Sequence, residues 1–317
     1  MSSATNAVES WLSARLPAHL AQRRGAAVPV HERPWATVFR VPVDGDDLWL
    51  KCTTGLARHE ASLVELLRAR LGPVVPEVVV RDETNGWFVT CGAPALPSAE
   101  GDPDRARRLW EAVLEQYGAM QREIAKESDA VVALGTLDLR AERLMDHLDM
   151  LLDGPGMDGH DELRSGIAGI RPQLEKWCAL LQESSVPASI QHDDLHLGNV
   201  FGGHGGHGFV IIDWADAVVT HPFGSLLYPL YAARRRGDTP AQIDRLVDAY
   251  LSGLGLPGRT AQTDATITAA LRLAGIPRAL MWQSLADLVG RAALTDYYGT
   301  GAPRWLGRMA DGTWALL

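Results

Sequence analysis

The sequence predicts an α+β fold of two lobes, in which a small antiparallel sheet with one helix precedes a larger, mostly helical lobe. Three observations predict it. Short β-rich segments at the start of the chain are separated by turns such as Asp44-Gly45-Asp46 and Asn85-Gly86, which favour hairpins. Residues 92–103 are rich in glycine and proline and mark a connector. Beyond them, apolar residues recur every three or four positions, as along one face of a helix.

The expected first lobe covers residues 1–92. Apolar residues at helical spacing within 5–20 predict an amphipathic helix ahead of the sheet. A second helix is expected between the third and fourth strands, and Gly72-Pro73 ends it. The expected strands cover residues 27–31, 37–43, 48–52, 77–81 and 87–90, and that second helix covers 56–71.

The expected second lobe covers residues 93–317. Its most regular segment places Leu109, Trp110, Val113 and Leu114 on one side of a helix. The expected helices cover residues 104–124, 139–153, 160–182, 240–254, 262–275 and 278–297.

The composition excludes several classes of function. A net charge of −9 over 317 residues argues against a nucleic-acid partner. The three cysteines, Cys52, Cys91 and Cys178, are odd in number and widely spaced, which is typical of a reducing cytoplasm and not of a disulfide framework. The sequence shows neither 18 consecutive apolar residues nor a secretion signal, so we expect no membrane partner. A small molecule is the expected partner.

The segment that carries chemistry runs over residues 189–217, SIQHDDLHLGNVFGGHGGHGFVIIDWADA. It predicts two short strands, at 200–201 and 209–212, joined by a glycine-rich turn. The turn includes His204 and His207, but no cysteine or carboxylate completes a metal site, so exposed hairpin histidines are expected.

Ionisable residues flank this hairpin at informative spacing. His192, Asp194 and Asn199 fit H-x-D-x-x-x-x-N, and Asp213 lies fourteen residues after Asn199. This is the arrangement of a kinase catalytic loop and its metal-binding loop. Phosphoryl transfer needs a carboxylate at the acceptor hydroxyl, which is Asp194, and oxygen ligands for magnesium between the ATP phosphates, which are Asn199 and Asp213. His192 is expected to brace the loop by hydrogen bonds.

The segment resembles the aminoglycoside phosphotransferase and choline kinase-like family, whose signature is H-G-D-L-H-x-x-N followed by I-D-W or I-D-F. The chain departs from it at Asp193, where the family usually has glycine. The resemblance covers about residues 27–297 and implies a protein-kinase-like fold and an ATP- and Mg²⁺-dependent small-molecule kinase. The residues that carry it are His192, Asp194, Leu195, His196, Gly198, Asn199 and Ile212-Asp213-Trp214.

A kinase of this type also needs a lysine on the third strand and a glutamate on the following helix. Lys51 lies near the end of the third expected strand. Glu60 shares the apolar face of the expected helix with Leu56, Leu63 and neighbouring residues. Since a buried carboxylate needs a cationic partner, we expect Glu60 to pair with Lys51 and to orient its amine towards the ATP phosphates.

Two further segments are candidates for nucleotide contacts. The loop between the first two strands lacks the glycines of a protein-kinase G-x-G-x-x-G, so the backbone amides of Trp35 and Ala36 are the candidates there. The resemblance places the hinge between lobes at residues 90–93, where Thr90, Cys91 and Ala93 would meet adenine.

The resemblance assigns acceptor binding to the second lobe. The candidate carboxylates are Asp193, Asp216, Asp287 and Asp296, which would pair with ammonium groups; for each, a solvated or capping side chain is the alternative. By the same resemblance, Ser225 lies in or near the place of an aspartate that often braces the catalytic loop in the family. The acceptor therefore stays open among an aminoglycoside-like antibiotic, an aminosugar, an amino alcohol and another hydroxylated metabolite.

Two other functions remain as alternatives. A metal-dependent phosphohydrolase would use His192-Asp193 as an HD pair, but it needs further histidine and aspartate ligands that the sequence does not offer at matching positions. A catalytically silent nucleotide-binding kinase homologue is disfavoured, because the charged parts of the machinery are all retained.

Overall fold

The computed structural model describes residues 3–20, 22–53, 55–206, 208–298 and 301–311. The chain divides into two compact units. The first comprises Met1–Leu96 with Val200–Ala215, and the second comprises Pro97–Asn199 with Asp216–Leu317. No helix in the described part of the chain combines the length and the apolar character that crossing a membrane requires.

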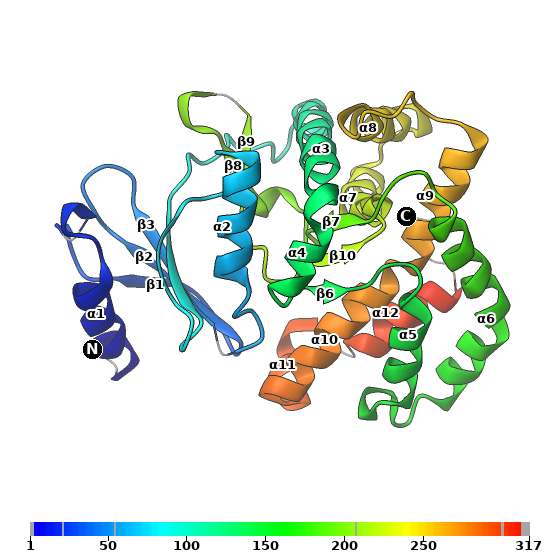
Figure 1. Ribbon diagram of the computed structural model, residues 1–317, viewed down its shortest axis with the longest axis horizontal. Coiled ribbons are helices and arrows are strands. Elements are labelled where there is room, and N and C mark those ends of the chain that lie inside the picture. Colours follow the sequence, from blue (N-terminus) through cyan, green and yellow to red (C-terminus); the bar gives the residue numbers. More distant parts are fainter. Residues whose placement is uncertain (1–2, 21, 54, 207, 299–300, 312–317) are drawn as a thin grey trace. The chain divides into compact units, whose positions relative to one another are not determined.

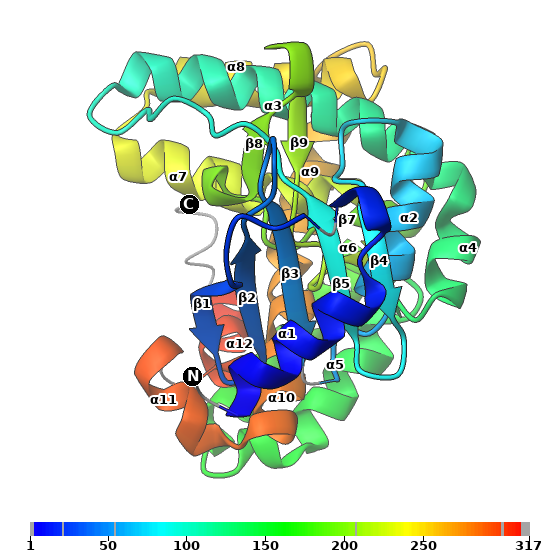
Figure 2. The same cartoon turned by 90° about the vertical axis from the view of Figure 1, so that its left-hand side faces the viewer.

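The first unit is built on a five-stranded antiparallel sheet of order β1-β2-β3-β5-β4. Helix α1, Ser3–Arg15, lies across one face of this sheet, and helix α2, Glu60–Leu71, lies on the other (Figures 1 and 2). The predicted small sheet with a helix is confirmed. The strands are β1 Val28–Arg33, β2 Ala36–Val41, β3 Leu48–Thr53, β4 Val78–Asp82 and β5 Trp87–Cys91.

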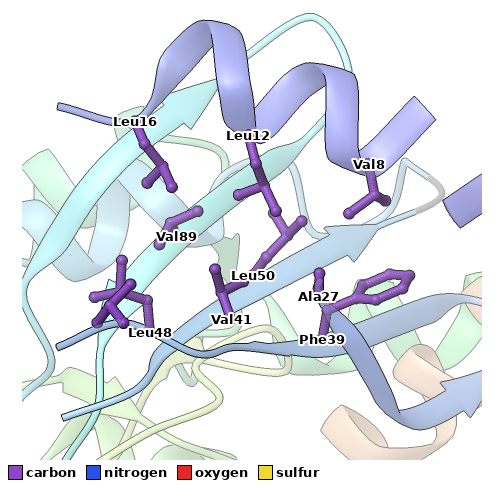
Figure 3. Packing of buried hydrophobic residues seen from close by; sticks show 10 residues of the cluster. Val8, Leu12, Leu16, Ala27, Phe39, Val41, Leu48, Leu50 and Val89 are labelled. Carbon is purple, nitrogen blue, oxygen red and sulfur yellow. The ribbon is translucent and has the colours of Figure 1, made fainter. Parts of the chain in front are cut away.

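Alternation along the strands separates an apolar face from a polar one. Side chains of α1 point onto the sheet, and the strand residues that they meet are apolar (Figure 3). Leu48 and Leu50 of β3 belong to this cluster, and since successive strand residues point to opposite faces, Lys51 is directed to the face that carries α2. The buried cluster comprises Val8, Leu12, Leu16, Ala27, Phe39, Val41, Val43, Leu48, Leu50 and Val89.

Helix α2 begins later than the sequence predicts. Residues 56–59 form a tight turn in which the Glu60 N–H donates to the Ala57 carbonyl, 3.1 Å away. Leu56 is 41% exposed and does not join the apolar face of the helix. Glu60 therefore stands in the first turn, where the positive end of the helix dipole favours a carboxylate.

The glycine-rich segment forms the hairpin that the sequence predicts. Strands β8, Val200–Gly202, and β9, Phe209–Ile211, pair in antiparallel register. The Gly202 N–H donates to the Pro94 carbonyl at 2.8 Å, and the Ile211 N–H donates to the Val74 carbonyl at 3.0 Å. These bonds tie the hairpin to the loops that flank β4 and β5.

The second unit is mostly helical, as predicted, around a three-stranded sheet that the sequence did not reveal. Central β10, Val218–Thr220, pairs with β6, Leu137–Asp138, and with β7, Ser189–Gln191. The helices are α3 Pro103–Ile124, α4 Ser128–Ala133, α5 Leu144–Asp153, α6 Asp161–Gln182, α7 Leu227–Arg236, α8 Pro240–Gly253, α9 Ala261–Leu273, α10 Gly275–Val289, α11 Arg291–Tyr298 and α12 Ala302–Asp311.

Two predicted helices have different bounds in the structure. The helix expected from 139 starts at Leu144, because the Leu139 N–H donates to the Val219 carbonyl at 2.8 Å and keeps the chain extended beside β10. The helix expected over 278–297 is broken at Gly290, whose φ of 82° is outside the helical region.

Close packing of α3 on α8 positions part of the site. A Cβ atom at Gly118 or Gly253 would collide with main-chain atoms of the other helix, so glycine at both positions lets the two backbones approach. This approach brings Tyr250 of α8 within hydrogen-bonding distance of Gln121 of α3.

Candidate active site

Lys51 makes ion pairs with two carboxylates in the first unit. Its Nζ lies 2.9 Å from Oε1 and 2.7 Å from Oε2 of Glu60, and 2.6 Å from Oδ1 of Asp213. The β3 strand supplies the lysine, the first turn of α2 supplies the glutamate, and the residue two positions after β9 supplies the aspartate. The ion pair expected between Lys51 and Glu60 is confirmed.

The burial of Glu60 explains why this pair forms. Glu60 is 1% exposed, so its charge needs a partner inside the unit. Burial alone would lower the pKa of Lys51, but the charges of Asp213 and Glu60 raise it above the ordinary lysine value. Lys51 is therefore a fixed cation.

Asp213 stands in an unusual backbone conformation. Its φ is 63°, in the left-handed region that few non-glycine residues adopt. The indole Nε1 of Trp214 donates to the Ile211 carbonyl at 2.9 Å and fixes the turn around it. The Asp213 side chain is 48% exposed, so the carboxylate is accessible as well as paired.

The loop after β7 carries the H-x-D-x-x-x-x-N residues of the second unit. His192 is fully buried; its N–H donates to the Tyr117 hydroxyl at 2.8 Å, and its Nδ1 accepts from the Asp194 N–H at 3.3 Å. Asn199 ends a 3₁₀ turn, Leu197–Asn199, and its Nδ2 donates to the Asp194 carbonyl at 3.0 Å. These bonds brace the loop from both sides of Asp194.

The Asp194 carboxylate is ionised and reachable. Its side chain is 30% exposed. Burial opposes ionisation, but the His196 hydrogen bond and the Arg278 charge bring the pKa of Asp194 below its ordinary value. His196 Nδ1 accepts from the Gly198 N–H at 3.0 Å, which places the ring proton on Nε2, 3.5 Å from Asp194 Oδ2. His196 belongs to the matched signature, but sequence reasoning gave it no role.

A neutral hydrogen-bond network around Ser225 supports β7. The buried Ser225 hydroxyl accepts from Gln121 Nε2 at 3.0 Å, and the same nitrogen donates to the Ile190 carbonyl at 2.6 Å. The Tyr250 hydroxyl donates to Gln121 Oε1 at 2.5 Å. Ser225 thus belongs to an uncharged brace of the strand that leads into the loop.

Asp193 is buried, which rules out the simple solvated side chain weighed from the sequence. Its φ is 60°, and its Oδ1 accepts from Gln191 Nε2 at 2.7 Å. Arg278 NH1 lies 2.7 Å from the Asp193 carbonyl oxygen and 3.5 Å from Oδ2. Burial raises the pKa of Asp193 to about 7, against the opposing effects of Arg278 and Gln191.

Arg278 is the contact that sequence reasoning missed. It is buried in α10, and its NH1 also pairs with Asp216 Oδ2 at 3.1 Å. Its guanidinium carbon lies 5.5 Å from the Tyr228 ring centroid and 5.4 Å from that of Trp305. The available signal was a single charge inside the apolar run of residues 276–282, IPRALMW.

The other candidate residues for substrate binding come from three different segments of the second unit. The Asp216 side chain is 28% exposed and is linked to the loop after β7 by its ion pair with Arg278. Asp287 is exposed and accepts from Gln283 Nε2 at 2.7 Å within α10. Nine residues separate it from Arg278, which places it on the opposite side of α10 and about 13 Å further along. Asp296 lies in α11, but its side chain is outside the described residues.

The candidate phosphate loop is a short turn without glycine. Arg33 pairs with Ala36, so Pro34 and Trp35 form a two-residue connection between β1 and β2. Trp35 is half-buried, and Ala36 is the first residue of β2.

The candidate hinge residues lie at the end of β5 and just beyond it. Thr90 pairs with Trp49, and the Cys91 N–H donates to the Glu77 carbonyl at 2.9 Å. Ala93 is half-buried in an irregular segment.

The hairpin histidine His204 contacts the segment that follows β5, because its Nε2 lies 3.2 Å from the Gly92 carbonyl oxygen. His207 lies outside the described residues. Among the side chains that the structure describes, no three or more His, Cys, Asp or Glu gather as a metal site would require.

The phosphotransferase enzyme family matches the chain over residues 52–262. The chain belongs to this family. The phosphotransferase shares its fold with a choline kinase from Streptococcus pneumoniae at 12% identity and a TM-score of 0.63, covering 100% of both chains. A macrolide 2′-phosphotransferase from Brachybacterium faecium is 17% identical with a TM-score of 0.58, covering 92% of this chain and 97% of that one.

A third structure, the streptomycin–ATP–APH(2″)-IIa ternary complex, is 14% identical with a TM-score of 0.59, covering 94% of the phosphotransferase and all of the other chain. No curated protein matches the chain. The family and the kinase-like α+β fold expected from the sequence are confirmed. The family match makes the chain a small-molecule phosphotransferase enzyme.

Proposed function

We propose that the chain moves the γ-phosphate of ATP, with Mg²⁺, to a hydroxyl of a small molecule such as an aminoglycoside-like antibiotic, an aminosugar or an amino alcohol. The observation that carries the proposal is the Asp194 carboxylate, which is ionised, accessible and held in a loop braced by His192 and Asn199. A kinase needs such a carboxylate at the acceptor hydroxyl.

Asp194 orients the acceptor and receives its proton. The hydroxyl donates a hydrogen bond to the carboxylate. As the hydroxyl oxygen bonds to the γ-phosphorus, the bond from that phosphorus to the β,γ-bridging oxygen breaks, ADP leaves, and the hydroxyl proton passes to Asp194. His196 Nε2 and the bond from Asn199 to the main chain limit the positions that the carboxylate can take. Positioning of this kind is the main part of catalysis in phosphoryl transfer.

Lys51 binds the phosphates of the nucleotide. Its amine is a permanent cation, and Glu60 fixes its direction from the α2 side. A lysine held by a helix glutamate is the arrangement by which kinases orient the nucleotide phosphates. The sequence position of Lys51 on β3 agrees with that role.

Asp213 and Asn199 would hold Mg²⁺, which neutralises charge between the phosphates when bound. The donor set fits a hard cation. The Asp213 carboxylate is accessible, and Asn199 uses its Nδ2 for the Asp194 carbonyl, which leaves Oδ1 as the amide atom for a metal. Carboxylate and amide oxygens are ligands that Mg²⁺ accepts.

The backbone groups of Trp35 and Ala36 are assigned to the phosphates, and those of Thr90, Cys91 and Ala93 to adenine. A protein of the same fold forms a ternary complex with streptomycin and ATP, which supports an adenine nucleotide. That complex, the choline kinase and the macrolide 2′-phosphotransferase together support a hydroxylated acceptor that carries nitrogen. The free thiols of Cys52, Cys91 and Cys178 support action in the cytoplasm.

The test is acceptor-dependent release of ADP. A panel of hydroxylated amines, aminosugars and antibiotics is screened with wild type and with Asp194→Asn. One or more acceptors should stimulate ADP release by wild type and not by the variant. Release of phosphate from nucleotides or esters without an acceptor would favour a phosphohydrolase. ATP binding without turnover in either protein would favour a silent nucleotide-binding homologue.

A further inference from the structure

The Arg278 guanidinium makes its contacts with the loop through one nitrogen. NH1 lies 2.7 Å from the Asp193 carbonyl oxygen, 3.5 Å from the Asp193 carboxylate and 3.1 Å from Asp216. The shortest contact is with the main chain of the residue directly before Asp194. We infer that Arg278 is a positioning residue that fixes the peptide at Asp193 and thereby places the Asp194 carboxylate. The inference rests on the proposed role of Asp194.

The conformation of Asp193 explains why the loop needs this contact. Its φ of 60° is in the left-handed region, which is unfavourable for a residue with a Cβ atom and easy for glycine. Such conformations persist where surrounding contacts hold them. Arg278 holds both the main-chain carbonyl and the carboxylate, and Gln191 holds the other carboxylate oxygen. The aspartate and the arginine therefore act as one unit in this chain.

The arginine is itself immobilised from the far side. Tyr228 of α7 and Trp305 of α12 place their rings about its guanidinium carbon, at 5.5 and 5.4 Å. A buried cation close to aromatic faces is attracted to their negative electron density. The loop is thus connected through Arg278 to three helices, α7, α10 and α12.

The charges indicate what happens when Arg278 is removed. Asp193 is buried and would lose its cationic partner, and Asp216 would lose the same partner. The pKa of Asp193, which burial already raises, would rise further without the cation, so this carboxyl would take up a proton and lose its charge-assisted contacts. The peptide at Asp193 would be free to rotate, because its carbonyl would also lose a donor. Displacement of Asp194 is the expected consequence.

Hydrogen exchange of the intact protein tests the brace without reference to activity. The informative N–H groups are those of Asp194, His196, Gly198 and Asn199, each of which makes a hydrogen bond within the loop. In Arg278→Met, peptides that cover residues 192–199 should exchange about tenfold faster or more. The matched control is Arg107→Met, which breaks the ion pair with buried Asp238 at 2.9 Å and leaves the loop untouched. Equal exchange in the two variants would overturn the inference.

Kinetics test the consequence for the reaction. Arg278→Met should lower kcat about 100-fold, since small displacements of a reacting group cost rates of that order, and should leave the KM for ATP within about threefold. Arg278→Lys should recover part of the loss, because one nitrogen makes all the contacts with the loop. An unchanged kcat in Arg278→Met, or a loss no larger than in Arg107→Met, would overturn the positioning role.

A further variant separates the carboxylate from the main-chain contact. Asp193→Gly keeps the carbonyl that Arg278 contacts and suits a positive φ, so its kcat should fall far less than that of Arg278→Met. An equal fall in kcat in the two variants would contradict the role given to the contact between Arg278 and the Asp193 carbonyl. A wild type without acceptor-dependent ADP release would overturn the proposed function, while the exchange experiment would still decide whether Arg278 holds the loop.

Discussion

The Nδ2 of Asn199 donates a hydrogen bond to the main-chain carbonyl of Asp194, 3.0 Å away. One amide therefore has two tasks, since its nitrogen closes the loop and its oxygen is assigned to Mg²⁺. Replacing Asn199 by two different residues should separate these tasks.

Asn199→Ala removes both groups, whereas Asn199→Asp keeps an oxygen ligand and loses the donor. We expect the alanine variant to need at least about tenfold more Mg²⁺ and to lose about 1 kcal/mol of unfolding free energy, because the Asp194 carbonyl keeps the His196 N–H but loses its second donor. The aspartate variant should have a Mg²⁺ requirement closer to that of wild type, but a lower kcat. Mg²⁺ titration of ADP release and urea unfolding measure these effects. A wild-type Mg²⁺ requirement in Asn199→Ala would contradict the assignment.

Lys51→Met should destabilise the first unit as well as weaken ATP binding. Glu60 would stay buried without its cation, which costs about 3 kcal/mol of unfolding free energy. The double variant Lys51→Met/Glu60→Gln should regain most of that stability but none of the ATP affinity. Urea unfolding and calorimetric titration with ATP distinguish the two effects. Recovery of ATP binding in the double variant would exclude Lys51 as the phosphate ligand.

Asp213 offers a matched pair of substitutions because of its positive φ. Asparagine tolerates the left-handed region better than alanine, so Asp213→Asn should keep the fold while Asp213→Ala should lose about 1 kcal/mol more. Both should abolish the Mg²⁺-dependent part of nucleotide binding, because both remove the charge. ATP binding with and without Mg²⁺ is the measurement. If Mg²⁺ still strengthens binding in both, Asp213 is not the ligand.

His221 should make stability depend on pH. Burial lowers the pKa of His221 to about 4, below its ordinary value of 6.5, so the unfolded chain binds the proton more tightly between these two values. The contribution of the neutral ring to stability is fully present above about pH 6.5 and is lost as the pH falls towards 4. The resulting loss of unfolding free energy should reach about 2 kcal/mol at pH 5.

His221→Asn removes this titration, and the difference between the two proteins isolates it from the carboxylates. Urea unfolding at pH 7.5, 6 and 5 should show the free-energy gap between wild type and variant narrowing as the pH falls. A constant gap over that range would contradict the lowered pKa.

The sequence predicted the strands of the first unit within a few residues because alternation and turn chemistry are local signals. It also predicted the pairing of Lys51 with Glu60, since a carboxylate on an apolar helix face needs a cation. The start of α2 was misplaced, because Leu56 continues the apolar pattern although it lies in a turn.

Elements that depend on distant contacts escaped prediction. The strands β6, β7 and β10 have two or three residues each, too few to show a period, and they exist because they pair with one another. Arg278 escaped for the same reason: 85 residues separate it from Asp193, and only the fold brings them together. The departure from glycine at Asp193 could have signalled that a buried carboxylate required such a partner.

Helix α1 covers the apolar side of the sheet, although the family match begins at residue 52. A shortened chain cut to that match would lack α1, β1, β2 and most of β3, and it would leave Val89 without cover and β5 with an unpaired edge. Exposed apolar strands at a sheet edge favour aggregation. Expression of a trimmed gene should therefore give inclusion bodies, and a useful fragment has to include α1, Ser3–Arg15.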